Sequence, residues 1–354
     1  LLPKLKFLDL SSNILLKEFK TNKPSLEYLN LKNIHHLDLI ETTNFPNLKY
    51  LYISKLSYKT IEKLLLQRIG YLELDLSFMN LSNISFVTRR VSISLKILKL
   101  RNSLVHFNFS SLFYNLIEVD ITACTFTRFD TQNFFSNTLY TIQILRLSNL
   151  KINSNLLVNL SINSFLSLEE LDLSINEIDH IPNEIFDLYS LKTLNLSMNL
   201  VKILKPENEL TRKNLNFDIS FNKLAFFNYL INESLYLAHN NLHYFEFEMV
   251  NTTVVLVDLS HNKIKRFSYI SQLRQYKLKI LRLSNNDLEY FPNDFLFYYF
   301  NLIELNLSNN RLINLDSLIF QNQLSLRKLS LNNNKLNSLP NDLFTDSLKL
   351  YEID

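Results

Sequence analysis

Leucine recurs along the chain in a fixed frame, L-x-x-L-x-L-x-x-N-x-L, in which apolar and polar positions alternate just before a polar turn position. Clear copies begin at Leu5, Leu168, Leu191, Leu278, Leu302 and Leu326. The L-x-L alternation places both leucines on one face of a short strand. Successive copies are mostly about 21 to 26 residues apart, which is the period of a solenoid built from stacked coils. The sequence therefore predicts one parallel strand in each coil.

The polar position of the frame follows each strand and must satisfy backbone groups in a buried turn. Asparagine offers both a donor and acceptors for this role, so stacked asparagines predict a structural ladder through the coils. They are Asn13, Asn176, Asn199, Asn222, Asn240, Asn262, Asn286, Asn310 and Asn334. The same slot is filled differently in the N-terminal half, by Ile34, Leu56, Met79, Ser103, Cys124 and Leu150. We therefore expect that half to be less regular.

The second half of several coils carries a proline followed four residues later by an apolar residue, as in Pro182 with Phe186 and Pro340 with Phe344. With the repeated leucine frame, this resembles the leucine-rich-repeat family over essentially the whole chain, and the L-P-x-x-x-F ending resembles the typical repeats of animal extracellular members. The resemblance implies an α/β leucine-rich-repeat solenoid, or horseshoe, with one parallel concave sheet and irregular or 3-10 convex segments. We expect a single domain over residues 1–354, with about 15 repeats and partial repeats at both ends.

Composition removes several classes of chemistry. Gly70 is the single glycine, and phosphate-binding loops and nucleophile elbows need several. Cys124 is the single cysteine, which excludes an internal disulfide and a cysteine-based zinc cluster. His239 and His243 lack a third ligand placed by the sequence, and no motif brings a Ser, a His and an Asp together. We expect no catalytic site, no metal site and no cofactor, and therefore no enzyme.

The charge balance and the apolar runs limit the partners. The formal net charge is +3, with Lys and Arg mixed evenly among Asp and Glu, which does not indicate a nucleic-acid surface. No uncharged apolar run approaches the roughly 18 residues that cross a bilayer, so a membrane would be reached only through segments outside this chain. The resemblance to Toll-like receptor ectodomains implies an extracellular or secreted recognition module, with receptor dimerisation as a further possibility. The single cysteine keeps a cytoplasmic scaffold or regulatory subunit open as the alternative.

Solvent-facing strand positions are where repeats of this kind bind a protein or another extended ligand. The first repeats present aromatic side chains there, and the fifth presents basic ones. The candidate ligand-binding residues are Tyr28, Tyr50, Tyr52, Phe78, Lys96, Lys99 and Arg101. Tyr50 and Tyr52 flank the buried Leu51 and are expected to form the centre, with Lys49 and Lys55 at the rim, because exposed aromatics often dominate interfaces.

N-glycosylation sequons are about as frequent as chance predicts from the abundance of Asn, Ser and Thr. Asn195 and Asn306 lie between strand leucines, where a glycan would block the concave face. Asn83 and Asn251 lie in expected loops and are the better candidates for glycosylation in a secreted protein.

Overall fold

The structure is a computed structural model, and the part of the chain that it describes covers 3–20, 23–34, 37, 39–41, 45–56, 70–81, 94–105, 114–126, 140–204, 215–227, 233–247, 250, 252–269 and 277–354. The chain divides into two compact units, Leu1–Leu173 (unit 1) and Ser174–Asp354 (unit 2). Calling the whole chain a single domain stays a prediction.

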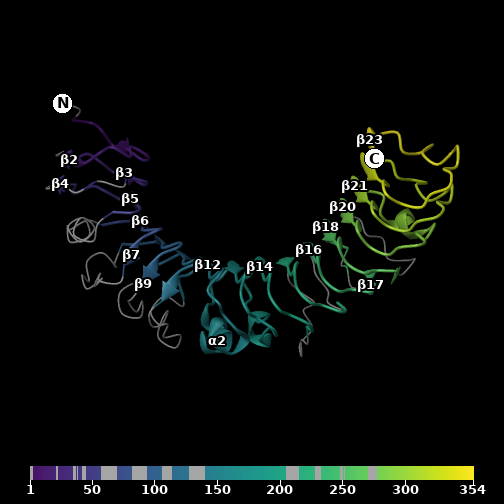
Figure 1. Cartoon of the computed structure of the whole chain (residues 1–354), viewed down its shortest axis with the longest axis horizontal. Helices are drawn as coiled ribbons and strands as arrows, with labels where there is room; N and C mark the ends of the chain where they lie inside the picture. The colour runs from purple at the N-terminus through teal and green to yellow at the C-terminus, as the bar shows by residue number, and fades with distance from the viewer. Residues whose placement is uncertain are drawn as a thin grey trace. The chain divides into compact units, whose positions relative to one another are not determined.

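Unit 1 contains a parallel main sheet to which each coil contributes one short strand (Figure 1). In sheet order these strands are β1 (Phe7–Asp9), β3 (Tyr28–Leu31), β5 (Tyr50–Ile53), β6 (Glu73–Asp75), β8 (Ile97–Lys99), β10 (Glu118–Asp120), β12 (Ile144–Arg146) and β13 (Glu170–Asp172). Two smaller parallel sheets pair β2 (Glu18–Lys20) with β4 (Leu39–Glu41), and join β7 (Asn80–Leu81), β9 (Leu104–Val105) and β11 (Thr125–Phe126). The helical segments described here are α2 (Ser154–Asn159) and η2 (Ile162–Ser164).

Unit 2 repeats this arrangement with a second set of short parallel strands (Figure 1). In sheet order they are β14 (Thr193–Asn195), β15 (Asn216–Asp218), β16 (Ser234–Tyr236), β18 (Leu256–Asp258), β20 (Ile280–Arg282), β21 (Glu304–Asn306), β22 (Lys328–Ser330) and β23 (Glu352–Ile353). A small sheet pairs β17 (Tyr244–Glu246) with β19 (Arg266–Ser268), and two 3-10 turns are η3 (Asn183–Ile185) and η5 (Phe295–Tyr298). The predicted fold class, a solenoid of parallel strands with few helices, is confirmed.

The strand leucines form the core in the way that the alternation predicts. The central residue of nearly every strand is buried, as at Leu51, Leu98 and Leu305, which are fully inaccessible to solvent. Aromatic side chains of neighbouring coils fill the opposite side of the core in unit 2, where the rings of Phe320 and Phe344 stack 5.5 Å apart. Burial of these rows supplies the hydrophobic stabilisation that a single coil could not provide.

Each strand is followed by a tight turn that begins in the left-handed backbone region. The residue just before the asparagine slot has a φ between 53° and 62° in all fifteen coils, and none of these residues is glycine. Asn tolerates this conformation, but Ile175 is β-branched and strained there. The frame read from the sequence therefore corresponds to one repeated backbone conformation.

Side chains at the slot complete the turns differently in the two units. In unit 2, Asn222 accepts a hydrogen bond from the Val201 N–H of the preceding coil at 2.9 Å and donates to the Leu196 carbonyl of that coil and the Ile219 carbonyl of its own. Asn240, Asn262, Asn286, Asn310 and Asn334 repeat these bonds coil after coil.

In unit 1, smaller polar groups make part of the same pattern. The Ser103 hydroxyl accepts from the Met79 N–H at 3.1 Å and donates to the Leu76 carbonyl at 3.0 Å. The Cys124 thiol donates to the Leu100 carbonyl at 2.8 Å. Ile34 instead fills its slot as a fully buried apolar side chain. The turn is thus preserved where the asparagine is not.

Candidate functional site

Two rows of side chains lie on the exposed face of the unit 1 sheet. Because the strands pair in register, the first residue of each strand lies beside the first residue of the next, and the same holds for the third. We call these the first row and the third row. The first row runs Phe7, Tyr28, Tyr50, Glu73, Ile97, Glu118, Ile144, Glu170, and the third runs Asp9, Asn30, Tyr52, Asp75, Lys99, Asp120, Arg146, Asp172.

Four aromatic rings gather at β1, β3 and β5, and we call Phe7, Tyr28, Tyr50 and Tyr52 the aromatic patch. The ring of Tyr28 is central, since it stacks on Phe7 with centroids 4.0 Å apart and lies 6.4 Å from Tyr50 and 5.1 Å from Tyr52. Phe7 is 58% exposed and the three tyrosines are half-buried. The patch is thus an apolar surface that still faces solvent.

Charged groups hold the edge of the patch at Tyr52. The Lys32 ammonium lies 5.5 Å from the centre of the Tyr52 ring and 2.5 Å from a carboxylate oxygen of Asp75. Burial, followed by the charge of Glu73 and a hydrogen bond to it, raises the pKa of Tyr52 well above its ordinary value. The contacts with Lys32 and Tyr28 hold this ring in place before any partner binds, which lowers the entropy that binding would cost.

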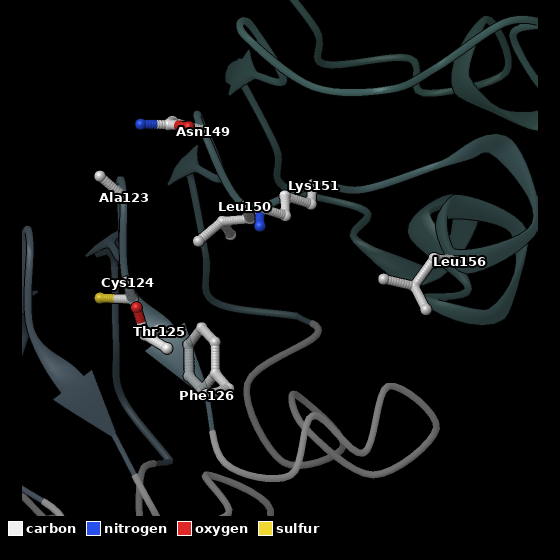
Figure 2. A pocket seen from close by; sticks show the side chains of 8 residues that line it. All are labelled: Ala123, Cys124, Thr125, Phe126, Asn149, Leu150, Lys151 and Leu156. Atoms are coloured by element: carbon white, nitrogen blue, oxygen red, sulfur yellow. The ribbon is translucent and has the colours of Figure 1, made fainter.

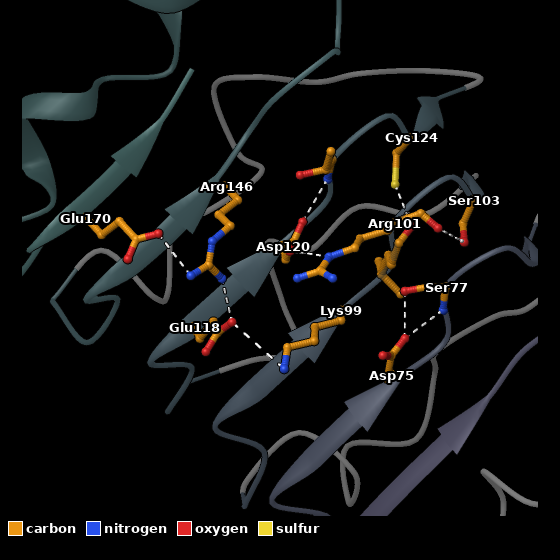
Figure 3. A network of polar contacts seen from close by, with 12 residues as sticks. Asp75, Ser77, Lys99, Arg101, Ser103, Glu118, Asp120, Cys124, Arg146 and Glu170 are labelled. Carbon is orange, nitrogen blue, oxygen red and sulfur yellow. Dashed lines mark hydrogen bonds and ion pairs between the residues drawn. The ribbon is translucent and has the colours of Figure 1, made fainter. Parts of the chain in front are cut away.

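A row of alternating charges continues the same face toward β13, as Figure 3 shows. Lys99 reaches Glu73 at 2.9 Å and Glu118 at 4.0 Å. Arg146 in turn bridges Glu118 at 2.6 Å and Glu170 at 2.9 Å. First-row carboxylates and third-row cations therefore neutralise one another across five strands, and we call these five residues the charge row.

The three basic candidates have different surroundings. Lys99 belongs to the charge row, and Arg101 pairs at 2.5 Å with Asp120, whose side chain is 1% exposed. Lys96 precedes β8 and is exposed at the rim of a shallow hollow that Tyr140 and Gln143 also line. An acidic ligand would have to compete with carboxylates already bound to Lys99 and Arg101.

The remaining residues expected at this face lie partly elsewhere. Phe78 is not on a strand, because β6 ends at Asp75 and Phe78 occupies the left-handed turn that follows, where it is 54% exposed. Lys49 is at the rim and pairs with Glu27 at 3.0 Å, whereas Lys55 is the left-handed turn residue after β5.

The unit 2 face is more polar and carries no comparable cluster of rings among its strand residues. Its first three strands present Thr193, Asn216 and Ser234 in the first row. The sequon asparagines Asn195 and Asn306 each accept hydrogen bonds from the backbone and the hydroxyl of the serine two residues later. Asn83 and Asn251 lie outside the described residues.

The single cysteine lines a pocket of about 400 Å³ between two coils of unit 1, shown in Figure 2. Thr125, Phe126 and Leu150 lie around it, and Leu156 of α2 closes one side. The thiol itself donates to Leu100, and burial raises the pKa of Cys124 to about 12. A thiolate is the reactive form of cysteine, so this thiol acts as part of the turn and not as a nucleophile.

The histidines do not form a metal site with other described side chains. Among the described residues, no three His, Cys, Asp or Glu side chains converge in a manner that would hold a metal ion. His239 stacks on His261 with ring centroids 4.0 Å apart, and His243 is exposed past the turn. In the described part of the chain, none of the helices has the length and hydrophobicity of a membrane span.

Solved structures similar to this chain are all leucine-rich-repeat proteins. A leucine-rich-repeat protein of Leptospira interrogans is 24% identical with a TM-score of 0.75, over 99% of this chain and 90% of that one. An internalin of Listeria monocytogenes is 17% identical with a TM-score of 0.58, over 94% and 87%. The Toll receptor of Drosophila, solved with Spatzle, is 17% identical with a TM-score of 0.66, over 97% of this chain and 47% of that one. No family model and no curated protein sequence matches the chain.

At these identities the similarity is one of fold, and it agrees with the repeat frame, the repeated left-handed turn and the parallel sheets. The chain folds as a leucine-rich-repeat solenoid.

Proposed function

We propose that the chain is a non-catalytic recognition module that binds a protein through the aromatic patch on the unit 1 sheet, within a Toll-like or related leucine-rich-repeat receptor ectodomain. The observation that carries the proposal is the patch itself, an exposed phenylalanine and two half-buried tyrosines gathered around the half-buried ring of Tyr28 on adjacent strands. Clustered aromatic side chains bury a large area at low entropic cost and are enriched among interface hot spots.

The patch is preferred over the basic residues because of the state of the charges. Lys99 and Arg101 already have carboxylate partners at 2.9 and 2.5 Å, so a ligand gains little by replacing one partner with another. The aromatic rings face water instead, and covering them removes apolar surface from water, which favours binding. An extended sheet face also suits a protein surface better than a small substrate.

The receptor setting rests on the L-P-x-x-x-F repeat endings and on the fold similarity to Toll, whose structure contains the protein Spatzle. An extracellular location, glycosylation and dimerisation belong to the same proposal. The single cysteine favours an intracellular scaffold instead. Labelling of intact cells with a membrane-impermeant reagent separates the two, because only the receptor is labelled from outside.

Peptide selection tests the binding surface without a known ligand. A random 12-residue peptide library is selected on the purified chain, and the recovered peptides are measured on the double variant Tyr28→Ala/Tyr50→Ala. We expect binding to weaken about 30-fold, since central aromatics contribute about 2 kcal/mol. Tyr140→Ala is the matched control, because Tyr140 is 70% exposed in the same unit but lies off the sheet.

Unchanged affinity for the double variant, with an intact unfolding transition, would place the binding surface elsewhere. Steep salt dependence in such peptides would point to the basic residues Lys96, Lys99 and Arg101.

A further inference from the structure

We propose that the aromatic patch receives a lysine or arginine side chain of the protein partner, with Asp9 as the carboxylate that pairs with it. This rests on the proposed function and names the chemistry of the partner. Three observations support this inference: the pairing of charges around the patch, the fixed position of Asp9, and the aromatic rings beside it.

Carboxylates surround the patch, and those near it have cationic partners with one exception. Glu27 pairs with Lys6 at 2.8 Å and with Lys49 at 3.0 Å. Asp75 pairs with Lys32 and Glu73 with Lys99. Asp9 is exposed and makes no ion pair with any described residue. The patch therefore borders on a negative charge that a partner can neutralise.

The position of Asp9 is fixed by neutral donors. One carboxylate oxygen accepts a hydrogen bond from the Ser11 backbone N–H at 2.8 Å, and the other accepts from the Asn30 amide at 3.0 Å. Asp9 is two residues beyond Phe7 on the same strand, so both side chains project from the same face of the sheet. Asn30 lies beside Asp9 in the third row, two residues beyond Tyr28. The carboxylate and the rings thus border one surface.

Aromatic rings next to a carboxylate form a recognised kind of cation site, because the ring face is electron-rich and the carboxylate supplies charge-assisted hydrogen bonds. The patch already contains an internal example, since Lys32 lies over the Tyr52 ring while pairing with Asp75. A basic side chain bound between the aromatic patch and Asp9 would combine the same two kinds of contact, a ring and a carboxylate.

The electrostatics of the two groups agree with this geometry. Hydrogen bonds from Ser11 lower the pKa of Asp9 below its ordinary value, so the carboxylate is ionised at neutral pH. Burial raises the pKa of Tyr28, and the charges of Asp9 and Glu73 raise it further. The Tyr28 hydroxyl therefore senses the Asp9 charge and stays neutral.

Asp9→Asn is a sharp test because other coils carry asparagine at the same place. Asn195 and Asn306 accept the same backbone hydrogen bond from the residue two positions later, each at 3.0 Å. The substitution therefore removes the charge and retains the turn. Asp218→Asn is the matched control, since Asp218 occupies the third row of unit 2 and accepts from Ser220 at 2.9 Å.

The probe is the same random 12-residue peptide library, selected separately on the wild-type chain, Asp9→Asn and Asp218→Asn. We expect lysine and arginine to be enriched among peptides recovered on the wild type and on Asp218→Asn, and not on Asp9→Asn. A wild-type peptide should bind Asp9→Asn about tenfold more weakly, as expected for one charge-assisted pair. Its analogue with glutamine at the basic position should bind both proteins equally.

The outcomes separate this inference from the proposed function. Peptides that lose binding to Tyr28→Ala/Tyr50→Ala but bind Asp9→Asn as tightly as the wild type overturn the inference and leave the aromatic surface in place. Peptides that bind the double tyrosine variant normally overturn both. Circular dichroism of each variant confirms that the folded state is retained.

Discussion

Unit 2 fills its asparagine slot with asparagine in every coil from Asn176 to Asn334, whereas unit 1 has asparagine only at Asn13 among its seven slots. On the exposed faces of the sheets, it is unit 1 that has the distinctive side chains. Unit 1 presents the aromatic patch and the charge row, while the first strands of unit 2 present small polar side chains. The left-handed turn residue is nevertheless present in all coils of both units.

The comparison teaches that the turn and the ladder are separable. Turn geometry persists with Ile34 or Met79 in the slot, both of which are buried, so the amide is not required to form the turn. Its contribution is to satisfy backbone groups of two coils at once, as Asn222 does. Coils with other occupants must satisfy those groups by shorter side chains or by the backbone alone.

The largest expected effect comes from breaking the regular ladder. Asn310→Ala removes an amide that accepts from the Leu288 N–H at 3.1 Å and donates to the Leu283 and Leu307 carbonyls at 2.9 and 3.0 Å. These buried groups would be left unpaired, so we expect the free energy of unfolding to fall by about 2 kcal/mol in urea titrations.

Asn13→Ala is the control for this change, because Asn13 is exposed and, among the described residues, its side chain donates only to carbonyls of its own coil. We expect a loss below about 0.5 kcal/mol. Equal losses at Asn310 and Asn13 would show that the bonds between coils contribute nothing beyond those within one coil.

A smaller loss of stability is expected when the Ser103 hydroxyl, which occupies an asparagine slot in unit 1, is removed. Ser103→Ala removes one accepted and one donated hydrogen bond, so we expect a loss of about 1 kcal/mol in the unfolding free energy. Ser103→Asn should restore stability to within about 0.5 kcal/mol of wild type, since an amide can make both bonds. A strongly destabilised Ser103→Asn would mean that the unit 1 turns have become too tight for the ladder residue.

The smallest effect is a pH dependence confined to unit 2. His239 stacks between the rings of Phe221 and His261, each 4.0 Å away. Burial and the neighbouring His261 lower the pKa of His239, while Asp258 opposes them. The folded state therefore binds a proton less readily than the unfolded chain, so stability should fall as the pH drops below the ordinary histidine pKa of about 6.5.

This dependence is measured by unfolding the wild type and His239→Gln between pH 7.5 and 5.5. The wild type should lose stability relative to the variant on acidification, whereas His243→Gln, at an exposed position, should follow the wild type. A wild type that gains stability toward pH 5.5 relative to His239→Gln would reverse the sign of the coupling.

Much of the fold was predictable because the same sequence pattern marks the strand and the turn in each coil. The leucine frame located the strands, and in every coil a left-handed residue directly precedes the slot that the frame defines. The exposed face was predictable only in outline. Tyr28 was expected to face solvent, but its central place in the patch depends on ring contacts across β1 and β5, which spacing along one strand does not show.

The pairing of charges was also missed, although the sequence contained a signal for it. Lys99 and Arg101 were interpreted as a basic group because they are close along the chain. Aligning the strands by their central residues places acids in the first row and bases in the third row of alternate coils, from Glu73 to Glu170. Phe78 was expected at a strand position, although it directly precedes the Met79 slot, where each coil has its left-handed turn residue.

The charge row also constrains how coils can be added to this part of the solenoid by gene duplication. Arg146 lies between Glu118 and Glu170, and Lys99 between Glu73 and Glu118, so the repeating unit of charge is two coils long. A gene duplication that copies a single coil would place two like charges on neighbouring strands, about 4.8 Å apart, which is repulsive. Duplication of a pair of coils would preserve the alternation, so inheritance in this region should proceed by pairs.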